Sequence, residues 1–540
     1  MFKRVFVAGL SAVLLVGVST AALAQSVDPL LDDRMRAHVT FLASDELEGR
    51  DTGSRGFELA AQYVESNFTQ LGLTPMGNAE RTSWRQPVNF VELTTAAGEI
   101  TWGGQSFKQT EAVALFPSTV IGAQTLEAEV VFVGHGVVAP SADIDDYAGL
   151  DVRGKIVVML YDMPQGLPSE LSAHIQSSRS TTAAERGAVG VLTLLPAQAR
   201  MAPWGVIMGF LGDPQVKWAD AAGVPHTDAE GIKFEGFLST PMADALFAGA
   251  PMTAAQAQTD GSSQRVAGFE LPGRMTVNMT TEARPFASPN VVGVLEGSHP
   301  QLKNEYVVVM GHLDHVGIDQ EAPGEDKIFN GAMDNASGIA TMIEVARDLT
   351  AGERPKRSVI FLAVTGEEKG LLGSSYFAAN PTVPLGAIAG VVNLDMPILT
   401  YAFEDIIAWG AEHSTLGPIV RAATSAVGVG LADDPKPEEN FFVRSDHYEF
   451  VKKGVPSVFL GTGPGGPGAA AGDDFLENHY HKASDEVILP FDWDAAARFA
   501  VVNTSIARTI ANGERPRWYA DSPFTPLFAQ GQPTAIRPAN

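Results

Sequence analysis

Acidic and imidazole side chains follow the ends of three apolar runs in the second half of the chain. The run VVVMG is followed by His312, and Asp314 comes two residues later. The run VIFLAVTG is followed by Glu367 and Glu368, and VVNL is followed by Asp395. Functional groups of an open parallel sheet gather just beyond the carboxyl ends of its strands. Imidazole nitrogens and carboxylate oxygens at such a place can bind a divalent metal ion or act as a general base.

Two further candidates lie in loops. Asp334 stands at the start of a helix opened by DNASGIA, and His481 lies in the segment ENHYHKASDE. Each candidate alone has a simpler explanation, since an aspartate before a helix is often an N-cap and adjacent glutamates suit a first helical turn. Five such groups at successive element ends of one sheet instead predict a shared site.

The elements that must position these residues alternate between strand and helix. The hydrophobic patterns predict strands and helices that form an α/β fold, with a mostly parallel central sheet covered by helices on both faces. The predicted strands are 288–297, 305–317, 357–368, 388–397 and 455–463, and the predicted helices are 339–350, 371–380 and 414–428.

The rest of the chain differs in character. Residues 33–73 carry apolar residues at helical spacing, whereas Val-rich strands begin near residue 125. The periodicity of residues 200–285 is too weak to assign elements. The segment GTGPGGPGAAAGDD lacks the Gly-Lys-Ser/Thr ending of a phosphate-binding loop, so we expect a flexible loop beside the site. The Pro-rich tail, residues 513–540, is expected to be an extended flap or partly disordered.

The N-terminus predicts export. Lys3 and Arg4 precede an apolar run that ends at Val18, and small residues up to Ala24 follow, which is the pattern of a signal peptide over residues 1–24. The run is shorter than the ~20 residues that span a bilayer, and no Cys follows it, so we expect no stable membrane anchor. The expected location is the periplasm or the extracellular medium.

The composition limits which classes of partner the protein can bind and which residues can serve as metal ligands. The net charge of -26 disfavours nucleic acid and anionic lipid as partners. The chain has no Cys, so His, Asp and Glu must supply any metal ligands. Such donors suit zinc, manganese and similar divalent ions.

Six motifs together resemble the M28 zinc aminopeptidase family in order and spacing: GHLDHVG, GAMDNASG, TGEEKGLLGS, NLDM, RSDHYEF and YHKASDE. The resemblance implies a zinc exopeptidase-like peptidase domain formed by residues 25–124 and 286–512. It also implies that residues 125–285 form an inserted, mainly β protease-associated domain.

The same resemblance implies two Zn²⁺ ions per chain. His312 and Asp395 would hold one ion, Glu368 and His481 would hold the other, and Asp334 would bridge both. Other divalent ions fit the same donors.

The resemblance also assigns roles around the metals. Glu367 would be the general base, Asp314 would orient the ring of His312, and Tyr480 would stabilise the developing oxyanion. The two ions would share a water molecule, and one of them would bind the free α-amine of the substrate.

Four assignments stay open at this stage. His479 competes with His481 as a ligand, and His315 and His447 are expected behind the ligands or on the substrate side. Arg444 is a candidate for binding a substrate carboxylate, or it forms a surface ion pair.

The predicted function is therefore that of an aminopeptidase acting on peptides or proteins with a free N-terminus. The alternatives are a glutaminyl cyclase with a single zinc, a carboxypeptidase or dipeptidase on the same fold, and an inactive receptor-like binding protein. The related M20 group is disfavoured, because the chain between Asp395 and His481 is too short for a lid domain. The sequence contains no HExxH or GxSxG motif, which disfavours single-zinc endopeptidases and serine hydrolases.

Overall fold

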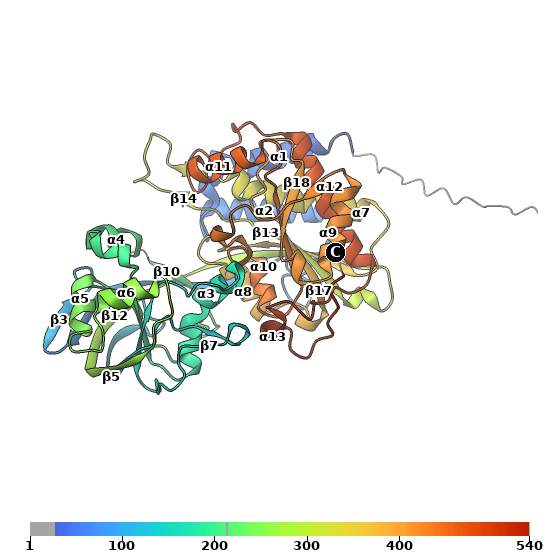
Figure 1. The fold of residues 1–540 in the computed structure, drawn as a ribbon. Coiled ribbons are helices and arrows are strands. Elements are labelled where there is room, and N and C mark those ends of the chain that lie inside the picture. Colours follow the sequence, from blue (N-terminus) through green and yellow to red (C-terminus); the bar gives the residue numbers. More distant parts are fainter. Residues whose placement is uncertain (1–27, 212–213, 539–540) are drawn as a thin grey trace, which may run out of the picture.

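The computed structural model describes residues 28–211 and 214–538, so the predicted signal peptide lies outside the described residues. The described chain forms two lobes (Figure 1). Two long strands, β2 (Arg85–Trp102) and β12 (Phe269–Leu295), pair in antiparallel register and run from one lobe into the other. A single 16-stranded sheet therefore continues through both lobes.

The first lobe is built on a central sheet with four parallel strands. Their order across the sheet is β20 (Ser457–Thr462), β17 (Ile388–Asn393), β13 (Tyr306–His312) and β16 (Ser358–Val364). The antiparallel strands β12 and β18 (Asp405–Trp409) flank them, and β19 (Gly430–Leu431) forms the edge beyond β18. The predicted α/β fold class is confirmed.

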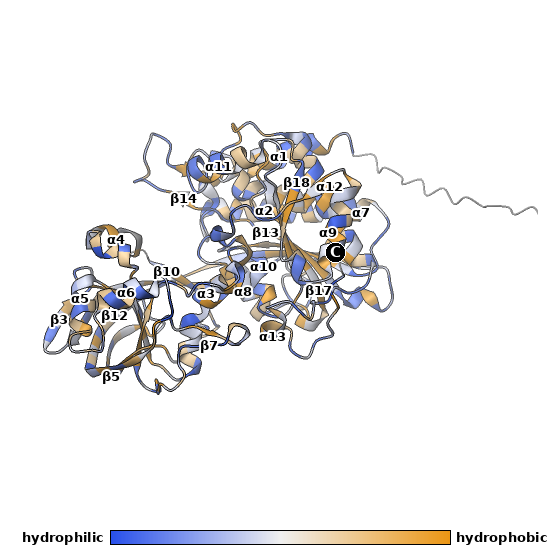
Figure 2. Cartoon of the chain, in the orientation of Figure 1, coloured by the Kyte–Doolittle hydropathy of each residue, from blue (hydrophilic) through white to orange (hydrophobic). Residues whose placement is uncertain are grey.

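Helices cover both faces of this sheet, so its strands are buried on both sides. Val307 and Val309 of β13 pack in the core under one set of helices, and Val308 and Met310 pack under the other set. Figure 2 shows these strands as the hydrophobic interior of the lobe. Burial on both faces explains why the strands are continuous apolar runs in the sequence. The first set of helices is α1 (Leu31–Leu42), α2 (Arg55–Gln70), α7 (Gly338–Ala351), α9 (Leu416–Ala426) and α12 (Trp493–Asn512), and the second is α8 (Leu372–Ala379) and α10 (His447–Val451).

The second lobe has a core of its own. Its sheet continues from β12 through β5 (Gly122–Phe132), β8 (Ile156–Leu160), β9 (Gly190–Leu194), β11 (Glu235–Leu238) and β4 (Val113–Leu115). Ile100, Phe107 and Leu115 belong to this core, so the lobe uses residues ahead of the predicted boundary at 125. Its helices are α3 (Ser169–Glu185), α4 (Trp204–Leu211), α5 (Thr240–Leu246) and α6 (Ala254–Gly261), and β3 (Gln105–Lys108) and β10 (Gln215–Ala219) pair with β2.

The glycine-rich segment is not wholly a flexible loop, as the sequence had suggested. Helix α11 (Gly468–Asn478) begins inside it. Three successive alanines favour the helix, and Phe475 anchors it because its side chain is buried in the main core. Lys436 also forms an ion pair with Asp473 of this helix.

The C-terminal tail packs on the first lobe through residue 538, which fits the first of the two expectations, an extended flap. Trp518 and Phe524 are buried in an aromatic cluster of the first lobe. The Trp518 indole also donates a 2.9 Å hydrogen bond to the Gly454 carbonyl. These anchors hold the tail against the lobe, although it contains only the short helix α13 (Thr525–Phe528).

Beyond the shared strands, the lobes contact each other at several places, which include an ion pair of Asp228 with Lys452 at 3.9 Å and the two contacts described next. At the first, Glu170 of α3 lies 2.8 Å from His413 Nε2, and His174 of α3 contacts the hydroxyl of Tyr448. At the second, the Trp218 indole donates a 3.2 Å hydrogen bond to Ser375.

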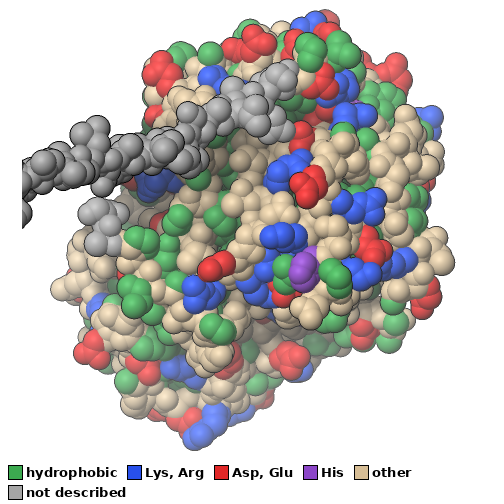
Figure 3. Space-filling view, turned by 90° about the vertical axis from the view of Figure 1, so that its right-hand side faces the viewer, with side chains coloured by type: hydrophobic (Ala, Val, Ile, Leu, Met, Phe, Trp, Pro, Cys, Tyr) green, Lys and Arg blue, Asp and Glu red, His purple; other side chains and the backbone are tan. Residues whose placement is uncertain are grey.

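The distribution of surface charge and the polarity of the helices are relevant to binding nucleic acid or a membrane. On the face in Figure 3, acidic and basic side chains are interspersed and do not form a patch of one sign. Within residues 28–211 and 214–538, every helix is too short or too polar to cross a lipid bilayer.

The ion pair at the first contact predicts a pH-dependent stability. Burial opposes the charge on His413, but Glu170 and Glu412 outweigh it and raise the pKa of His413. A raised pKa in the folded state adds stability below the ordinary pKa of histidine, and this stability is lost as the pH rises through the raised pKa. We expect Glu170→Gln to lower the thermal midpoint more at pH 6 than at pH 9. An equal effect at both pH values would contradict a charged pair.

Candidate metal centre

The predicted site residues come together at the carboxyl ends of the parallel strands. His312 is the last residue of β13, Glu367 and Glu368 follow β16, and Asp395 follows β17. Asp334 lies in an irregular segment, residues 332–337, that leads into α7, and its own backbone angles are not helical. His481 lies in the loop after α11.

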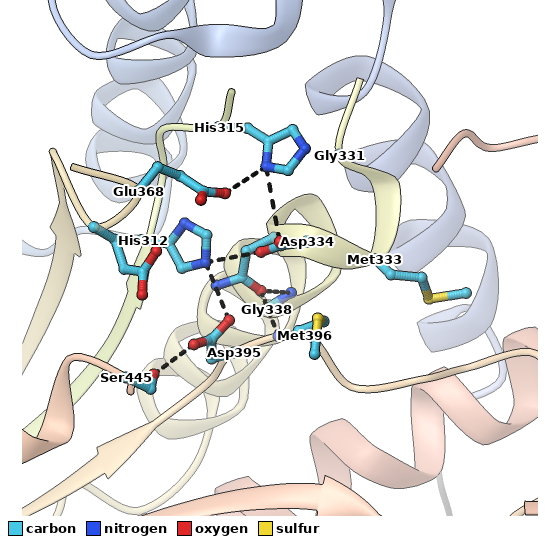
Figure 4. Close-up of polar contacts among 12 residues, drawn as sticks. His312, His315, Gly331, Met333, Asp334, Gly338, Glu368, Asp395, Met396 and Ser445 are labelled. Atoms are coloured by element: carbon cyan, nitrogen blue, oxygen red, sulfur yellow. Dashed lines mark hydrogen bonds and ion pairs between the residues drawn. The ribbon is translucent and has the colours of Figure 1, made fainter. Parts of the chain in front are cut away.

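Two carboxylates converge on His312. Its Nε2 atom lies 3.0 Å from Asp395 Oδ1 and 3.1 Å from Asp334 Oδ1 (Figure 4). The other ring nitrogen, Nδ1, lies 3.1 Å from the backbone carbonyl of Asp314. Because a carbonyl only accepts hydrogen bonds, Nδ1 donates to it, and Nε2 is the ring atom directed at the two carboxylates.

The second oxygen of Asp334 belongs to a different group of side chains. Asp334 Oδ2 lies 3.2 Å from His481 Nε2, and the same nitrogen lies 3.0 Å from Glu368 Oε2. Asp334 thus divides its two oxygens between a His312–Asp395 pair and a His481–Glu368 pair. A carboxylate placed in this way can bridge two cations.

His315 is closer to the carboxylates than the sequence indicated. Its Nδ1 lies 2.7 Å from Glu368 and 3.9 Å from Asp334 (Figure 4), and its side chain is fully buried. His479 lies outside the cluster, because its ring contacts Ser484 and Asp474. The signal for His315 was its place three residues after His312, on the same strand end.

Asp314 contacts the ring of His312, as the resemblance implied, but through its backbone. Its backbone carbonyl, and not its carboxylate, orients His312. The buried carboxylate accepts hydrogen bonds from the backbone N–H groups of Glu367 and Glu368 at 3.2 and 3.3 Å, and from the Thr52 hydroxyl at 3.0 Å. Asp314 therefore fixes the turn that presents both glutamates.

Two residues that sequence reasoning missed support the ligands. The Ser445 hydroxyl donates to Asp395 Oδ2 (Figure 4). It also accepts a 2.6 Å hydrogen bond from Asn393. Asp485 accepts hydrogen bonds from the backbone N–H groups of Met333 and Asp334 at 2.9 and 3.0 Å. Asp485 belongs to the YHKASDE motif, so its position was visible in the sequence but its role was not.

The backbone beside the ligands is held by Asn335. Its amide oxygen accepts hydrogen bonds from the N–H groups of Gly338 and Met396, at 3.0 and 3.2 Å. Its amide nitrogen donates to the Leu394 carbonyl at 2.9 Å. Met396 has a φ of 39°, which a non-glycine residue rarely adopts unless its surroundings enforce it.

Arg50 ties the ligand loops together from beneath the site. Its fully buried guanidinium donates hydrogen bonds to the backbone carbonyls of Leu313 at 3.0 Å, Asn330 at 2.6 Å and Gly331 at 3.0 Å, and also to that of Leu42. Burial lowers the pKa of Arg50 to about 10, so the side chain stays charged at neutral pH. One side chain thus joins the loop after His312 to the loop before Asp334.

The electrostatics of the cluster favour cations. Burial raises the pKa of Glu367 well above its usual value, and the neighbouring Glu368 and Asp395 carboxylates raise it further. Burial also opposes the charge on His312, yet the carboxylates around it raise its pKa well above the ordinary value. Among the described residues, no Lys or Arg forms an ion pair with Asp334, Glu367, Glu368 or Asp395.

These donors fit a pair of divalent cations. Imidazole nitrogen with carboxylate oxygen is a common ligand set for zinc. Buried carboxylates that outnumber their cationic partners are costly unless a metal ion neutralises them. The two groups of side chains around Asp334 offer a place for each ion.

The candidate substrate residues differ in position. Tyr480 and Arg444 line the cavity that contains the ligands. The Tyr480 ring stacks on His481 with centroids 3.9 Å apart, and Arg444 pairs with Glu439 at 3.1 Å. His447 is fully buried against Phe442 and Phe459 and does not line the cavity, so the substrate-binding role predicted for it does not fit.

Comparison with known proteins agrees with this site. Residues 290–507, which contain all the candidate ligands, match the model of peptidase family M28. A probable zinc metalloprotease of Pyricularia oryzae is 27% identical over 287 residues, which cover 45% of this chain and 53% of that protein. A probable glutamate carboxypeptidase of Arabidopsis thaliana is 25% identical over 374 residues, which cover 58% of this chain and 52% of that protein. The matched region thus spans about half the length of these two relatives.

Solved structures resemble the chain at low sequence identity. An aminopeptidase from Aneurinibacillus sp. strain AM-1 has a TM-score of 0.49 and 18% identity, over 95% of this chain and 99% of that chain. A zinc aminopeptidase from Bacillus subtilis has a TM-score of 0.44 and 16% identity, over 93% of this chain and 98% of that chain.

Arg50 generates a stability prediction. We expect Arg50→Met to lower the free energy of unfolding by on the order of 3 kcal/mol, because several buried carbonyls lose their donor at once. The shift in the urea midpoint of the metal-free protein measures this change. Arg55→Met is the matched control, since Arg55 is exposed and its nearest carboxylate, on Glu48, is 3.6 Å away. Similar midpoints for the two variants would contradict the assigned role of Arg50.

Proposed function

We propose that the chain is an exported di-zinc aminopeptidase of peptidase family M28. The match of residues 290–507 to that family supports the proposal. The observation that carries it is the placement of Asp334, whose Oδ1 faces His312 and whose Oδ2 faces His481. This arrangement provides ligands for two ions that share one carboxylate.

In the proposed site, each ion has its own pair of ligands. His312 and Asp395 would hold one ion, His481 and Glu368 would hold the other, and Asp334 would contribute to both. Zinc bound to these residues supplies positive charge that polarises a peptide carbonyl and lowers the pKa of a water molecule. His315 orients Glu368 through its 2.7 Å contact.

Glu367 transfers the proton in this proposal. Its side chain lines the cavity together with His312 and Asp395, so it can take a proton from the attacking water and pass it to the leaving amine. Asp314 keeps Glu367 in place by accepting a hydrogen bond from its backbone N–H, and Thr52 donates a hydrogen bond to Asp314. The Tyr480 hydroxyl, beside His481 in the cavity, donates a hydrogen bond to the carbonyl oxygen as negative charge develops on it.

An aminopeptidase fits the charges of the cavity better than a carboxypeptidase. The cavity walls include the carboxylates of Asp334, Glu367 and Asp395, which attract the ammonium group of a peptide N-terminus. Arg444 is the one Arg or Lys among the residues that line the cavity, and Glu439 already pairs with it. A carboxypeptidase, which the plant relative's name suggests, would require Arg444 to leave Glu439 and bind the terminal carboxylate of the substrate.

The substrates in this proposal are peptides or proteins with a free N-terminus, outside the cytoplasm. Export rests on the signal-peptide pattern of residues 1–24. The net charge of -26 disfavours nucleic acid as a partner.

Removing the base tests the chemistry. We expect Glu367→Gln to keep its zinc content and to lose about 100- to 10,000-fold in kcat, because the proton transfer is removed while the proposed ligands remain. Kinetics on L-leucine p-nitroanilide, together with metal analysis, measure both effects. Glu353→Gln, on an exposed residue ahead of β16, should leave both unchanged. Activity close to wild type in Glu367→Gln would exclude this base.

Removing the metal tests the cofactor. We expect 1,10-phenanthroline to abolish hydrolysis and added zinc to restore it, with recovery complete at two ions per chain. Mass spectrometry of the native protein counts the ions. Full activity in the chelator would refute the metal-dependent proposal, and recovery at one ion would favour a single-zinc enzyme.

A further inference from the structure

An apolar pocket adjoins the candidate metal centre. It has a volume of about 280 Å³, and Met396, Phe441 and Phe459 line both this pocket and the cavity of the ligands. Met396 directly follows Asp395 in the chain. A substrate whose carbonyl lies at the metal centre therefore has an adjacent side chain within reach of the pocket.

The chemistry of the pocket selects a large apolar side chain. Besides the three shared residues, its walls include Ile398, Trp409 and Leu476. The charged groups at its edge already have partners: Lys436 pairs with Asp473 at 2.5 Å, and Asp434 accepts a 2.8 Å hydrogen bond from the Trp409 indole. A charged substrate side chain would lose water there and gain no free partner.

One wall of the pocket depends on the segment 434–444. Phe441 of this segment packs against Trp409 with ring centroids 5.2 Å apart, and Trp409 stacks on Phe459 at 4.8 Å. The segment contains only two short helical turns, Pro437–Glu439 and Phe441–Val443, joined by Asn440 in a left-handed conformation. It has little regular structure of its own to hold Phe441 in place.

The second lobe supports this wall from behind. Helix α3 contacts both short turns. A second cavity, of about 260 Å³, has Glu170 and the residues before it on one side and Trp409 and Phe441 on the other. Glu170 and His174 fasten α3 to His413 and Tyr448 of the first lobe. The wall therefore stands between the side-chain pocket and the second lobe.

We propose that the second lobe sets the side-chain specificity of the site, because α3 holds the wall of a pocket that takes a large apolar side chain from the first residue of the substrate. This inference rests on the proposed aminopeptidase function for the identity of the substrate. Glu170 and His174 are positioning residues, since they act through Phe441. The second contact between the lobes, at Trp218 and Ser375, involves no residue that lines the pocket, so it provides a control.

The test compares substrates that differ in the size of the first side chain. We measure kcat/KM for L-leucine and L-alanine p-nitroanilides, and the dissociation constants of L-leucinol and L-alaninol by calorimetry on the zinc-loaded protein. The variants are Phe441→Ala, the double variant Glu170→Ala/His174→Ala, and the control Ser375→Ala. Glu170→Gln, which keeps the size of the side chain, replaces the double variant if that variant does not fold.

The wild type should prefer the leucine compounds by about tenfold or more in both measurements. Phe441→Ala and the α3 double variant should reduce that preference by about fivefold, mainly through KM, and Glu170→Gln should reduce it in the same direction. Ser375→Ala should leave the preference unchanged.

Each outcome separates the two proposals. A preference that survives in the α3 variants would overturn the role of the second lobe, and a wild type without any preference would overturn the pocket. If the wild type hydrolyses neither anilide but binds leucinol selectively, and the α3 variants lose that selectivity, the aminopeptidase function fails and the role of the lobe stands.

Discussion

The site depends on a surplus of buried negative charge. Asp314, Asp334, Glu367, Glu368 and Asp395 meet at the strand ends, and imidazoles are the only basic side chains that contact them directly among the described residues. Such a cluster would oppose folding unless cations compensate it. Hydrogen-bond donors in fixed positions partly compensate this charge. Asp314 accepts hydrogen bonds from two backbone N–H groups, and Asp395 accepts one from the Ser445 hydroxyl. The carboxylates are thus oriented before any cation binds.

The same constraint explains the architecture around the site. Parallel strands β13, β16 and β17 bring their carboxyl ends to one edge, and each is buried on both faces, so their relative positions are rigid. The loops between them are longer and need separate supports. Arg50 and Asp485, which are far apart in the chain, supply these supports by bonding the backbone of residues 330–334, just before and at Asp334.

The strand-end residues could be predicted from the sequence, because each of them follows an apolar run, and such a run indicates a buried strand without any knowledge of distant residues. The alternating strands and helices of the first lobe were predicted for the same reason. Arg50, Ser445 and the carboxylate role of Asp314 were beyond such reasoning. Their partners lie far away in sequence, as in the pairing of Arg50 with the loop before Asp334, and no local pattern marks them. The helix α11 was not predicted, because its segment is rich in glycine. Its position depends on Phe475, which is buried in the core of the first lobe.

The long strand β12 limits which shortened forms of this protein can keep the fold of the first lobe. Its first half pairs with β5 in the second lobe, and its last residues pair with β16, the strand that leads to Glu367. A deletion of the second lobe has to cut through β12, and only forms that keep residues 291–295 retain the strand that covers the edge of β16. The lobes are joined by shared strands and not by a linker, so shortened forms of the protein should preserve the end of β12 that pairs with β16.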